Sequence, residues 1–273
     1  MEYGASKYFR NALGAIGGLL FPPVCILCGT GRVTSDSSVC ESCAKDIYLV
    51  EGPICNHCGL PVPGLQSGSQ GRCGKCLEHK PLYDKARFSV YYSRVIRRGI
   101  LKFKFQSSLF LAETLSSYLT KTFQEHFLDE KLDAIIPIPV HDRRLVRRGY
   151  NQCAILAIKL GNNVNVEVLT NTLNKTVNTL PQTRLKRNQR IENVKGSFSV
   201  RKPEEIRGKR LLLLDDVFTT GSTISEASRT LRKHGADSVQ ALVLSVRHGA
   251  IEKDCGDEFD IFTEIFFIGG KRN

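Results

Sequence analysis

Two adjacent carboxylates, Asp215 and Asp216, and the small polar turn after them are the residues of this 273-residue chain best suited to chemistry. The turn consists of Thr219, Thr220, Gly221, Ser222 and Thr223. Its hydroxyl groups, and its backbone N–H groups at the start of a helix, are suited to bind a phosphate, and the glycine permits close approach. The carboxylates can accept hydrogen bonds from vicinal hydroxyls or help to hold Mg²⁺. A phosphate at one end and a diol at the other describe a ribose 5-phosphate.

Eight of the ten cysteines form a second set of reactive residues, because they come as four Cys-x-x-Cys pairs. Two such pairs complete a tetrahedral Zn²⁺ shell of four thiolates. A redox role is the alternative, but four pairs exceed what one redox centre needs. Sequential pairing predicts two zinc sites, and a cross-braced pairing is also open. The metal candidates are Cys25, Cys28, Cys40, Cys43, Cys55, Cys58, Cys73 and Cys76.

The residues around the acidic pair predict the elements that hold it. Four leucines, Leu211 to Leu214, precede the carboxylates, and such a run is typical of a strand buried in a parallel sheet. Residues 224–234 have helical spacing and end at Gly235, a helix-stop signal. An ordinary strand–turn–helix unit would leave the acidic pair and the hydroxyl-rich turn unexplained.

The rest of the chain alternates apolar strands with helical segments. A helix is predicted over residues 154–160, and another runs from a cap at Ser107 or Ser108 to about residue 127. This order predicts an α/β fold with a mostly parallel sheet flanked by helices. We expect it over residues 83–273, after an N-terminal helix and a double zinc-ribbon-like module over residues 1–82. The other strands are predicted at 86–92, 133–139, 164–168, 198–200, 238–246 and 260–268.

Basic residues are concentrated in the α/β part of the chain. The net charge is +12, and residues 83–251 carry +14. A polyanionic ligand, either a diphosphate or a nucleic acid, would explain this excess, although solvated charges on amphipathic elements are the alternative. The polar, basic stretch 173–193 is predicted to be a long loop that closes over the site. The candidates for binding a diphosphate or DNA are Lys102, Arg143, Arg147 and Arg148.

The N-terminal segment is apolar but does not have the features of a membrane span. The stretch Ala12 to Val24 is short and is interrupted by Pro22 and Pro23. It also lacks a clear signal-peptide cleavage site. We therefore expect no integral membrane segment and a cytoplasmic protein whose thiols stay reduced. Residues 1–24 are predicted to form an amphipathic helix packed on its own protein, with membrane-surface binding as the alternative.

The apolar strand, the two acids and the Thr-Thr-Gly-Ser-Thr turn resemble the PRPP-binding motif of type I phosphoribosyltransferases (PRPP is 5-phosphoribosyl 1-diphosphate). Over almost its whole length the chain resembles the ComF family, of the ComFC type, whose members join a zinc module to such a domain. The resemblance is carried by residues 20–29 (LFPPVCILCG), 101–105 (LKFKF), 136–139 (IPIP), 148–152 (RGYNQ), 190–198 (RIENVKGSF) and 219–223 (TTGST).

The resemblance implies that PRPP and Mg²⁺ bind here, with the 5-phosphate in the 219–223 loop and the ribose hydroxyls on Asp215 and Asp216. Departure of pyrophosphate would leave positive charge on the ribose, so positioning and charge neutralisation would carry catalysis. Asp216 is the candidate general base. The resemblance also implies structural Zn²⁺ in one or two sites, since many relatives have a single four-cysteine site.

Three functions are compatible with these features. The family is linked to natural competence, which implies a phosphoribosyltransferase that handles imported single-stranded DNA and meets proteins of the competence machinery. A PRPP sensor that has lost turnover is the second possibility. The third is an adaptor whose zinc module docks a partner. The acidic pair and its loop favour PRPP binding but do not separate catalysis from sensing.

Overall fold

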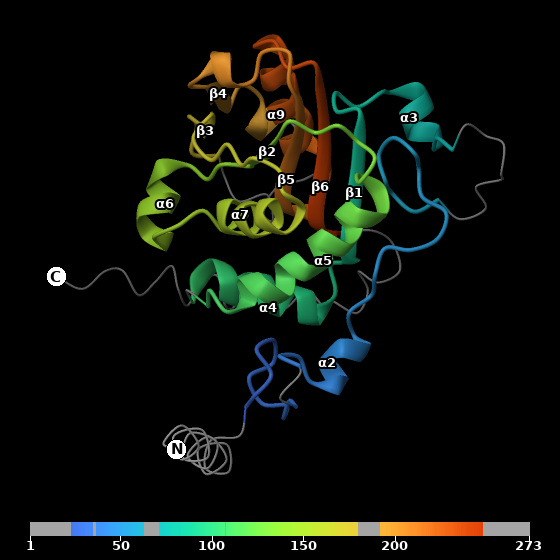
Figure 1. Cartoon of the computed structure of the whole chain (residues 1–273), viewed down its shortest axis with the longest axis vertical. Coiled ribbons are helices and arrows are strands. Elements are labelled where there is room, and N and C mark those ends of the chain that lie inside the picture. Colours follow the sequence, from blue (N-terminus) through green and yellow to red (C-terminus); the bar gives the residue numbers. More distant parts are fainter. Residues whose placement is uncertain (1–22, 35–36, 63–70, 107, 180–191, 248–273) are drawn as a thin grey trace, which may run out of the picture.

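The computed structural model describes residues 23–34, 37–62, 71–106, 108–179 and 192–247 (Figure 1). The helix predicted over residues 1–24, except for its last two residues, lies outside the described residues, as does the strand predicted over 260–268. In the described part of the chain, none of the helices combines the length and the apolar character that crossing a bilayer requires.

A four-stranded parallel sheet forms the centre of the fold (Figure 1). Its spatial order is β1-β6-β5-β2. Leu212 of β5 is in register with Ile135 of β2 on one side and with Gln240 of β6 on the other. The strand predicted from the leucine run is therefore confirmed as an inner strand. The strands are β1 (Lys85–Tyr91), β2 (Ala134–Pro137), β5 (Arg210–Phe218) and β6 (Ser238–Val246).

The leucine run divides its side chains between the two faces of the sheet, because successive residues of a strand point to opposite sides. Leu212 and Leu214 enter a core that they share with α4 (Arg94–Phe105), α5 (Leu111–His126) and α7 (Gln152–Val164). Leu211 and Leu213 enter the core on the other face, against α9 (Ser222–Lys233). The predicted α/β architecture, a parallel sheet flanked by helices, is confirmed.

Side-chain capping marks the start of α4 but not the start of α5. The Ser93 hydroxyl accepts a hydrogen bond from the N–H of Ile96 at the start of α4. Helix α5 begins at Leu111 after Phe110 and has no side-chain cap, so the predicted cap at Ser108 is wrong. Ser108 lies in the preceding turn, where its carbonyl accepts from the N–H of Leu111 at 3.0 Å. The other predicted cap, Ser107, lies outside the described residues.

The strand predicted over residues 164–168 is also wrong. Helix α7 continues to Val164 and ends at Asn165, whose backbone is left-handed with φ of 55°. Val168 then forms an isolated parallel bridge with Ile135 at the edge of the sheet. The alternating valines of this segment suggested a strand. Leu160 and Gly161 are buried in the core instead, and the helix continues past them to Val164.

Two short antiparallel strands form a second, separate sheet. It consists of β3 (Leu173–Lys175) and β4 (Phe198–Val200), so the predicted loop over 173–193 begins with a strand. The pair is held on α9, since the N–H of Gly196 donates to Glu226 Oε1 at 2.6 Å. Residues 180–191 of that loop lie outside the described residues. Further short helices are α2 (Glu41–Lys45), α3 (Gly74–Glu78), α6 (Asp142–Arg148) and the 3-10 turn η2 (Pro203–Glu205).

The cysteine-rich segment packs against both the helices and the sheet. We call Cys25–Cys43 the first ribbon and Cys55–Cys76 the second ribbon. The connection between them pairs with β1, where Leu49 forms an antiparallel bridge with Val90. The expected division of the chain between residues 82 and 83 stays a prediction.

Candidate functional site

The 219–223 turn is shaped by a glycine at the start of α9. Gly221 is the N-cap residue and has φ of 78°, a conformation that favours glycine. A Cβ atom there would lie 2.8 Å from Cζ of Phe218, whose ring packs on Phe88 with centroids 4.7 Å apart. Gly221 itself offers no side-chain cap, and the N–H of Ser222 donates to Thr220 Oγ1 at 3.4 Å, so the positive end of the α9 dipole faces the hydroxyl groups of the turn.

A small hollow joins this turn to one of the two carboxylates. We call it the loop hollow. Asp215 of β5 and residues at the start of α9 both line it. The predicted phosphate-binding turn and one predicted ribose-binding acid thus border the same space. The hollow is lined by Asp215, Val217, Phe218, Thr219, Gly221, Thr223 and Ile224.

The second carboxylate, that of Asp216, lies on the other face of β5. Asp216 follows Leu212 and Leu214 in the alternation and comes to the side of α4 and α7. It is 6% exposed and forms an ion pair with Lys104, the penultimate residue of α4. Gln152, the first residue of α7, donates from Nε2 to Asp216 Oδ2 at 3.3 Å. Two helices that are distant in sequence therefore fix this carboxylate.

Asp215 lies in the more unfavourable environment of the two acids. Burial raises its pKa to about 7, and the adjacent charge of Asp216 acts in the same direction. The backbone N–H of Asp216 donates to Asp215 Oδ1 at 2.8 Å and opposes the shift. The thiol of Cys153 approaches the same oxygen at 3.5 Å. Burial, followed by the two carboxylates, raises the pKa of Cys153, so this thiol stays protonated.

The structure places the predicted Lys102 away from the acidic pair and brings Lys104 to it instead. Lys102 Nζ donates to the carbonyl of Ile26 in the first ribbon at 3.2 Å. Residues two apart on a helix lie on different faces, so the two lysines of the LKFKF segment serve different neighbours. The LKFKF segment was the signal that could have pointed to Lys104. The sequence alone does not show which of its two lysines faces the acidic pair.

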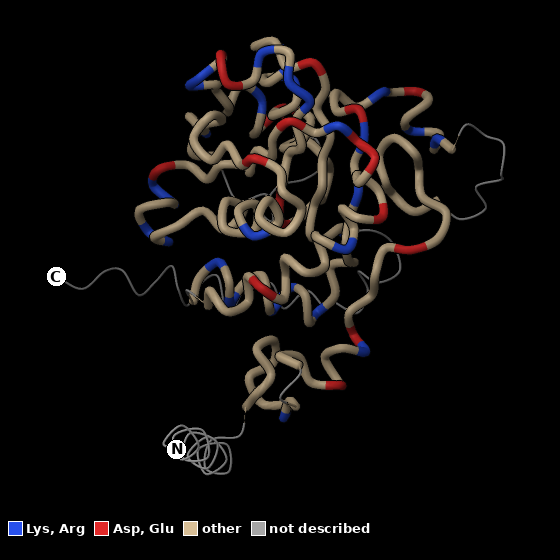
Figure 2. Tube along the Cα trace, viewed as in Figure 1, with Lys and Arg blue, Asp and Glu red and all other residues tan. Residues whose placement is uncertain are grey.

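The arginines of α6 divide into exposed and half-buried pairs. Arg143 and Arg147 are exposed, and Figure 2 shows the basic character of this helix at the left of the molecule. Arg148 is half-buried; its guanidinium lies 4.8 Å from the ring centroid of Phe105 and donates to Gln152 Oε1 at 3.1 Å. Arg148 thus contacts Gln152, one of the residues that hold Asp216.

The predicted set of diphosphate-binding candidates omits two cations, one on α6 and one on β3. Arg144 is half-buried and donates to the carbonyl of Thr179. Lys175 Nζ lies 5.5 Å from the ring centroid of Phe198, and burial, together with the charge of Arg144, lowers the pKa of Lys175 to about 8. Lys175 belongs to the basic stretch 173–193, which was the available signal.

The acidic pair fits a magnesium ion better than a softer metal. One ligand atom from each of Cys153, Asp215 and Asp216 lies within 4.8 Å of the others. Mg²⁺ takes oxygen ligands and usually one or two protein carboxylates together with phosphate oxygens and water. The two aspartates are of this type, whereas the protonated thiol is not. The oxygen atoms of this pair therefore suit Mg²⁺, and the Cys153 thiol does not.

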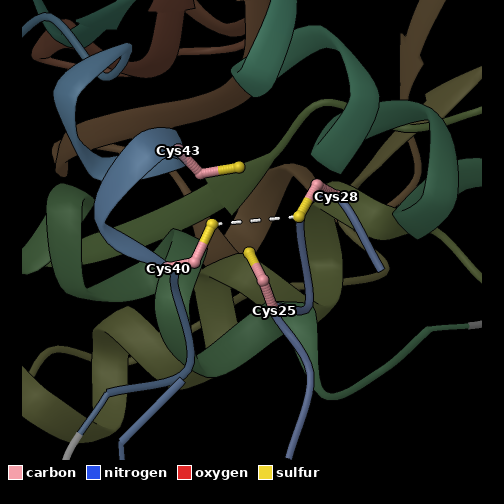
Figure 3. Close-up of side chains that lie close together, drawn as sticks. All are labelled: Cys25, Cys28, Cys40 and Cys43. Atoms are coloured by element: carbon pink, nitrogen blue, oxygen red, sulfur yellow. Dashed lines mark hydrogen bonds between the residues drawn. The ribbon is translucent and has the colours of Figure 1, made fainter. Parts of the chain in front are cut away.

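The eight cysteines gather into two clusters in the sequential pairing. In each cluster all four Sγ atoms lie within 4.8 Å of one another. Figure 3 shows the four cysteine side chains of the first ribbon gathered together. The Sγ–Sγ distance is 3.8 Å for Cys28 and Cys40, and 3.7 Å for Cys58 and Cys73. A tetrahedron with Zn–S bonds of about 2.3 Å requires about 3.8 Å. Both clusters therefore fit structural Zn²⁺, and the described cysteines form no disulfides.

Backbone N–H groups lower the pKa of some of these thiols, whereas burial raises the pKa of others. The N–H groups of Thr30 and Gly31 lower the pKa of Cys28 to about 5. Burial would raise the pKa of Cys55, but N–H groups, including those of Cys58 and Cys73, lower it to about 7. Burial raises the pKa of Cys43, so bound Zn²⁺ would displace a proton there.

Comparisons with known proteins agree with both parts of the fold. The family described as a double zinc ribbon domain matches residues 16–77, and the phosphoribosyl transferase domain family matches residues 114–270. Competence protein F of Haemophilus influenzae is 34% identical over 220 residues, which are 79% of this chain and 93% of the relative.

Two further relatives cover the chain to a similar extent. DNA utilization protein YhgH of Escherichia coli K12 is 28% identical over 83% of this chain and 98% of its own length. Competence protein ComFC of Bacillus subtilis is 26% identical over 84% of this chain and 97% of its own length.

Proposed function

Because this chain belongs to the ComF family, with a double zinc ribbon and a phosphoribosyl transferase domain, we propose that it binds PRPP with Mg²⁺ and acts in DNA uptake. The relatives named for competence and for DNA utilization support the biological role. The observation that carries the chemistry is the loop hollow, where Asp215 and the 219–223 turn border one space. We place the protein in the cytoplasm, where its zinc-binding thiols stay reduced.

In this proposal each part of the site has one task. The N-terminal turn of α9 binds the 5-phosphate, and Asp215 and Asp216 accept hydrogen bonds from the ribose hydroxyls. Arg144 and Lys175 supply positive charge to the leaving diphosphate. When Mg²⁺ is bound, it neutralises charge on the diphosphate. The acceptor of the phosphoribosyl group is the remaining unknown of this reaction.

Single-stranded DNA is the proposed partner of the exposed basic surface of α6. Arg143 and Arg147 are exposed there, and Val146 between them is 85% exposed. Arginines on such a surface bind backbone phosphates and release counterions, so the affinity must fall steeply with salt. Arg143→Ala/Arg147→Ala should reduce both the affinity for an oligonucleotide and the slope of that salt dependence. An unchanged slope would assign DNA binding to another surface.

The central experiment is calorimetric titration of the zinc-loaded protein with PRPP in the presence of Mg²⁺. The wild type should bind, and Asp215→Asn/Asp216→Asn should not, whereas Asp129→Asn at an exposed position should bind normally. Pyrophosphate release is measured in the same samples, with and without single-stranded DNA. DNA-dependent release supports a transferase, and binding without release supports a sensor. Absence of binding by the wild type would refute the proposal.

A further inference from the structure

Helix α4 connects the first ribbon to the acidic pair. Leu27 of the ribbon is fully buried against α4, where a Cβ on Gly99 would lie 2.7 Å from Leu27 Cδ2. Lys102 adds the hydrogen bond from its ammonium group to Ile26. The ribbon is also tied to α5, since the hydroxyls of Ser38 and Thr114 lie 2.8 Å apart.

The last turn of α4 is fixed on the opposite side by the candidate site. Lys104 forms the ion pair with Asp216, and the carbonyl of Phe103 accepts a hydrogen bond from the Tyr150 hydroxyl. The ring of Phe105 lies beneath the guanidinium of Arg148. These contacts join α4 to the RGYNQ segment, which itself supplies Gln152 to Asp216. The end of α4 and the start of α7 are thus one unit around this carboxylate.

Burying the Asp216 carboxylate costs free energy, and a well-placed cation offsets this cost. The side chains of Lys104 and Asp216 are 18% and 8% exposed. A buried carboxylate next to another carboxylate is strongly unfavourable unless it is paired with good geometry. Gly99 and Lys104 are five residues apart on a continuous helix, about 7.5 Å along its axis. A displacement of the ribbon would therefore move Lys104 relative to Asp216.

We propose that Lys104 is the positioning residue that holds Asp216 for the ribose of PRPP, and that the first ribbon sets the position of Lys104 through α4. This inference rests on the proposed PRPP site and names how that site is held. Lys104 acts on the ligand through Asp216. Its contribution to PRPP affinity therefore disappears when the Asp216 carboxylate is removed.

The first test compares lysine variants by their affinity for Mg²⁺–PRPP. Lys104→Met should weaken binding at least about tenfold, because it leaves Asp216 unpaired. Lys104→Arg keeps the charge and should restore most of the affinity. Lys159→Met removes a surface ion pair with Glu113 and should bind like the wild type. Equal or tighter binding by Lys104→Met would overturn the proposal, since the Lys104 ammonium would then contribute nothing to binding or would compete with the ligand for Asp216.

A double-mutant cycle separates positioning from direct contact with the ligand. Lys104→Met combined with Asp216→Asn should bind PRPP as weakly as Asp216→Asn alone. Additive losses would mean that Lys104 contacts PRPP itself, and would overturn the positioning role. If Lys104→Met alone does not fold, the pair Asp216→Asn and Asp216→Asn/Lys104→Met still shows whether Lys104 contributes in the absence of the Asp216 carboxylate, and neither variant holds an unpaired carboxylate at position 216.

The second test addresses the ribbon without removing a zinc ligand. Leu27→Ala should retain two Zn²⁺ per chain but weaken PRPP binding several-fold and speed amide hydrogen exchange in α4. Leu60→Ala in the second ribbon is the matched control and should change neither. Loss of PRPP binding in both variants, or in neither, would overturn the link through α4. Failure of the wild type to bind PRPP would instead refute the proposed function.

Discussion

The two zinc ribbons have the same ligands but are attached to the α/β domain in different ways. The first ribbon meets helices through side chains, and its buried cysteines share the apolar core of α4, α5 and α7. The second ribbon meets the edge strand β1. Its buried cysteines share the core on the other face of the sheet, and its main-chain carbonyls accept hydrogen bonds from β1. The N–H of Ala86 donates to the carbonyl of His57 at 2.8 Å, and Arg87 Nη1 donates to the carbonyl of Asn56 at 3.1 Å.

The difference separates stability from function. The second ribbon binds at the first residues of β1, whereas the site lies beyond the carboxyl ends of the parallel strands, where such sheets hold ligands. It covers a strand edge that would otherwise be open to pairing with another chain. The first ribbon instead contacts α4, whose last turn carries Lys104, the ion-pair partner of Asp216. We therefore expect damage to the second ribbon to affect folding, and damage to the first to affect ligand binding as well.

The largest expected effects follow from removing each zinc site in turn. Cys25→Ser/Cys28→Ser and Cys55→Ser/Cys58→Ser should each leave one Zn²⁺ per chain, measured by metal analysis. The folded fraction of the second variant should bind PRPP with nearly wild-type affinity but should aggregate more readily, because the β1 edge is uncovered. The first variant should lose most of its PRPP affinity. Equal PRPP affinities in the two variants would remove the functional distinction between the ribbons.

A matched pair of glycine substitutions should separate the two attachments by stability. Gly59 of the second ribbon has φ of 69°, and a Cβ there would lie 2.1 Å from the carbonyl oxygen of Ala86. Gly59→Ala should lower the free energy of unfolding by on the order of 3 kcal/mol, because both the backbone and the strand contact are strained. Gly99→Ala meets only the end of the Leu27 side chain and gains helix propensity, so it should cost less than about 1 kcal/mol. Denaturant unfolding measures both, and similar losses would contradict the comparison.

A change of stability with the opposite sign is expected at the site itself. The pKa of Asp215 is raised from 3.8 to about 7, so the folded state keeps a proton that the unfolded chain loses between these values. Stability therefore falls as the pH rises through this window, and the penalty is complete above pH 7. Asp215→Asn should raise the free energy of unfolding at pH 8 by on the order of 2 kcal/mol while abolishing PRPP binding.

The control for this prediction is the same measurement at pH 4.5. There Asp215 is protonated in the folded protein, so the stabilising effect of Asp215→Asn should largely disappear. A gain in stability that is independent of pH would mean that the charge of Asp215 is not its source.

The sequence by itself determined the parts of the protein that depend on short-range spacing. The leucine run, the acidic pair and the 219–223 turn lie within 13 residues, so a single strand and the helix after it bring them together. The cysteine pairs are equally local, and the two clusters form in sequential order. In both cases the chain closes a small loop, which costs little conformational entropy.

Only the tertiary structure decided which distant residues meet these motifs. The choice of Lys104 over Lys102 depends on how α4 is rotated between the first ribbon and the sheet. The contact of Gln152 with Asp216 depends on how α7 is docked on the sheet. Lys175 approaches the site because β3 pairs with β4 across the 173–193 stretch. A local pattern specifies what a segment can form, but the neighbour of a side chain depends on packing between elements far apart in the chain.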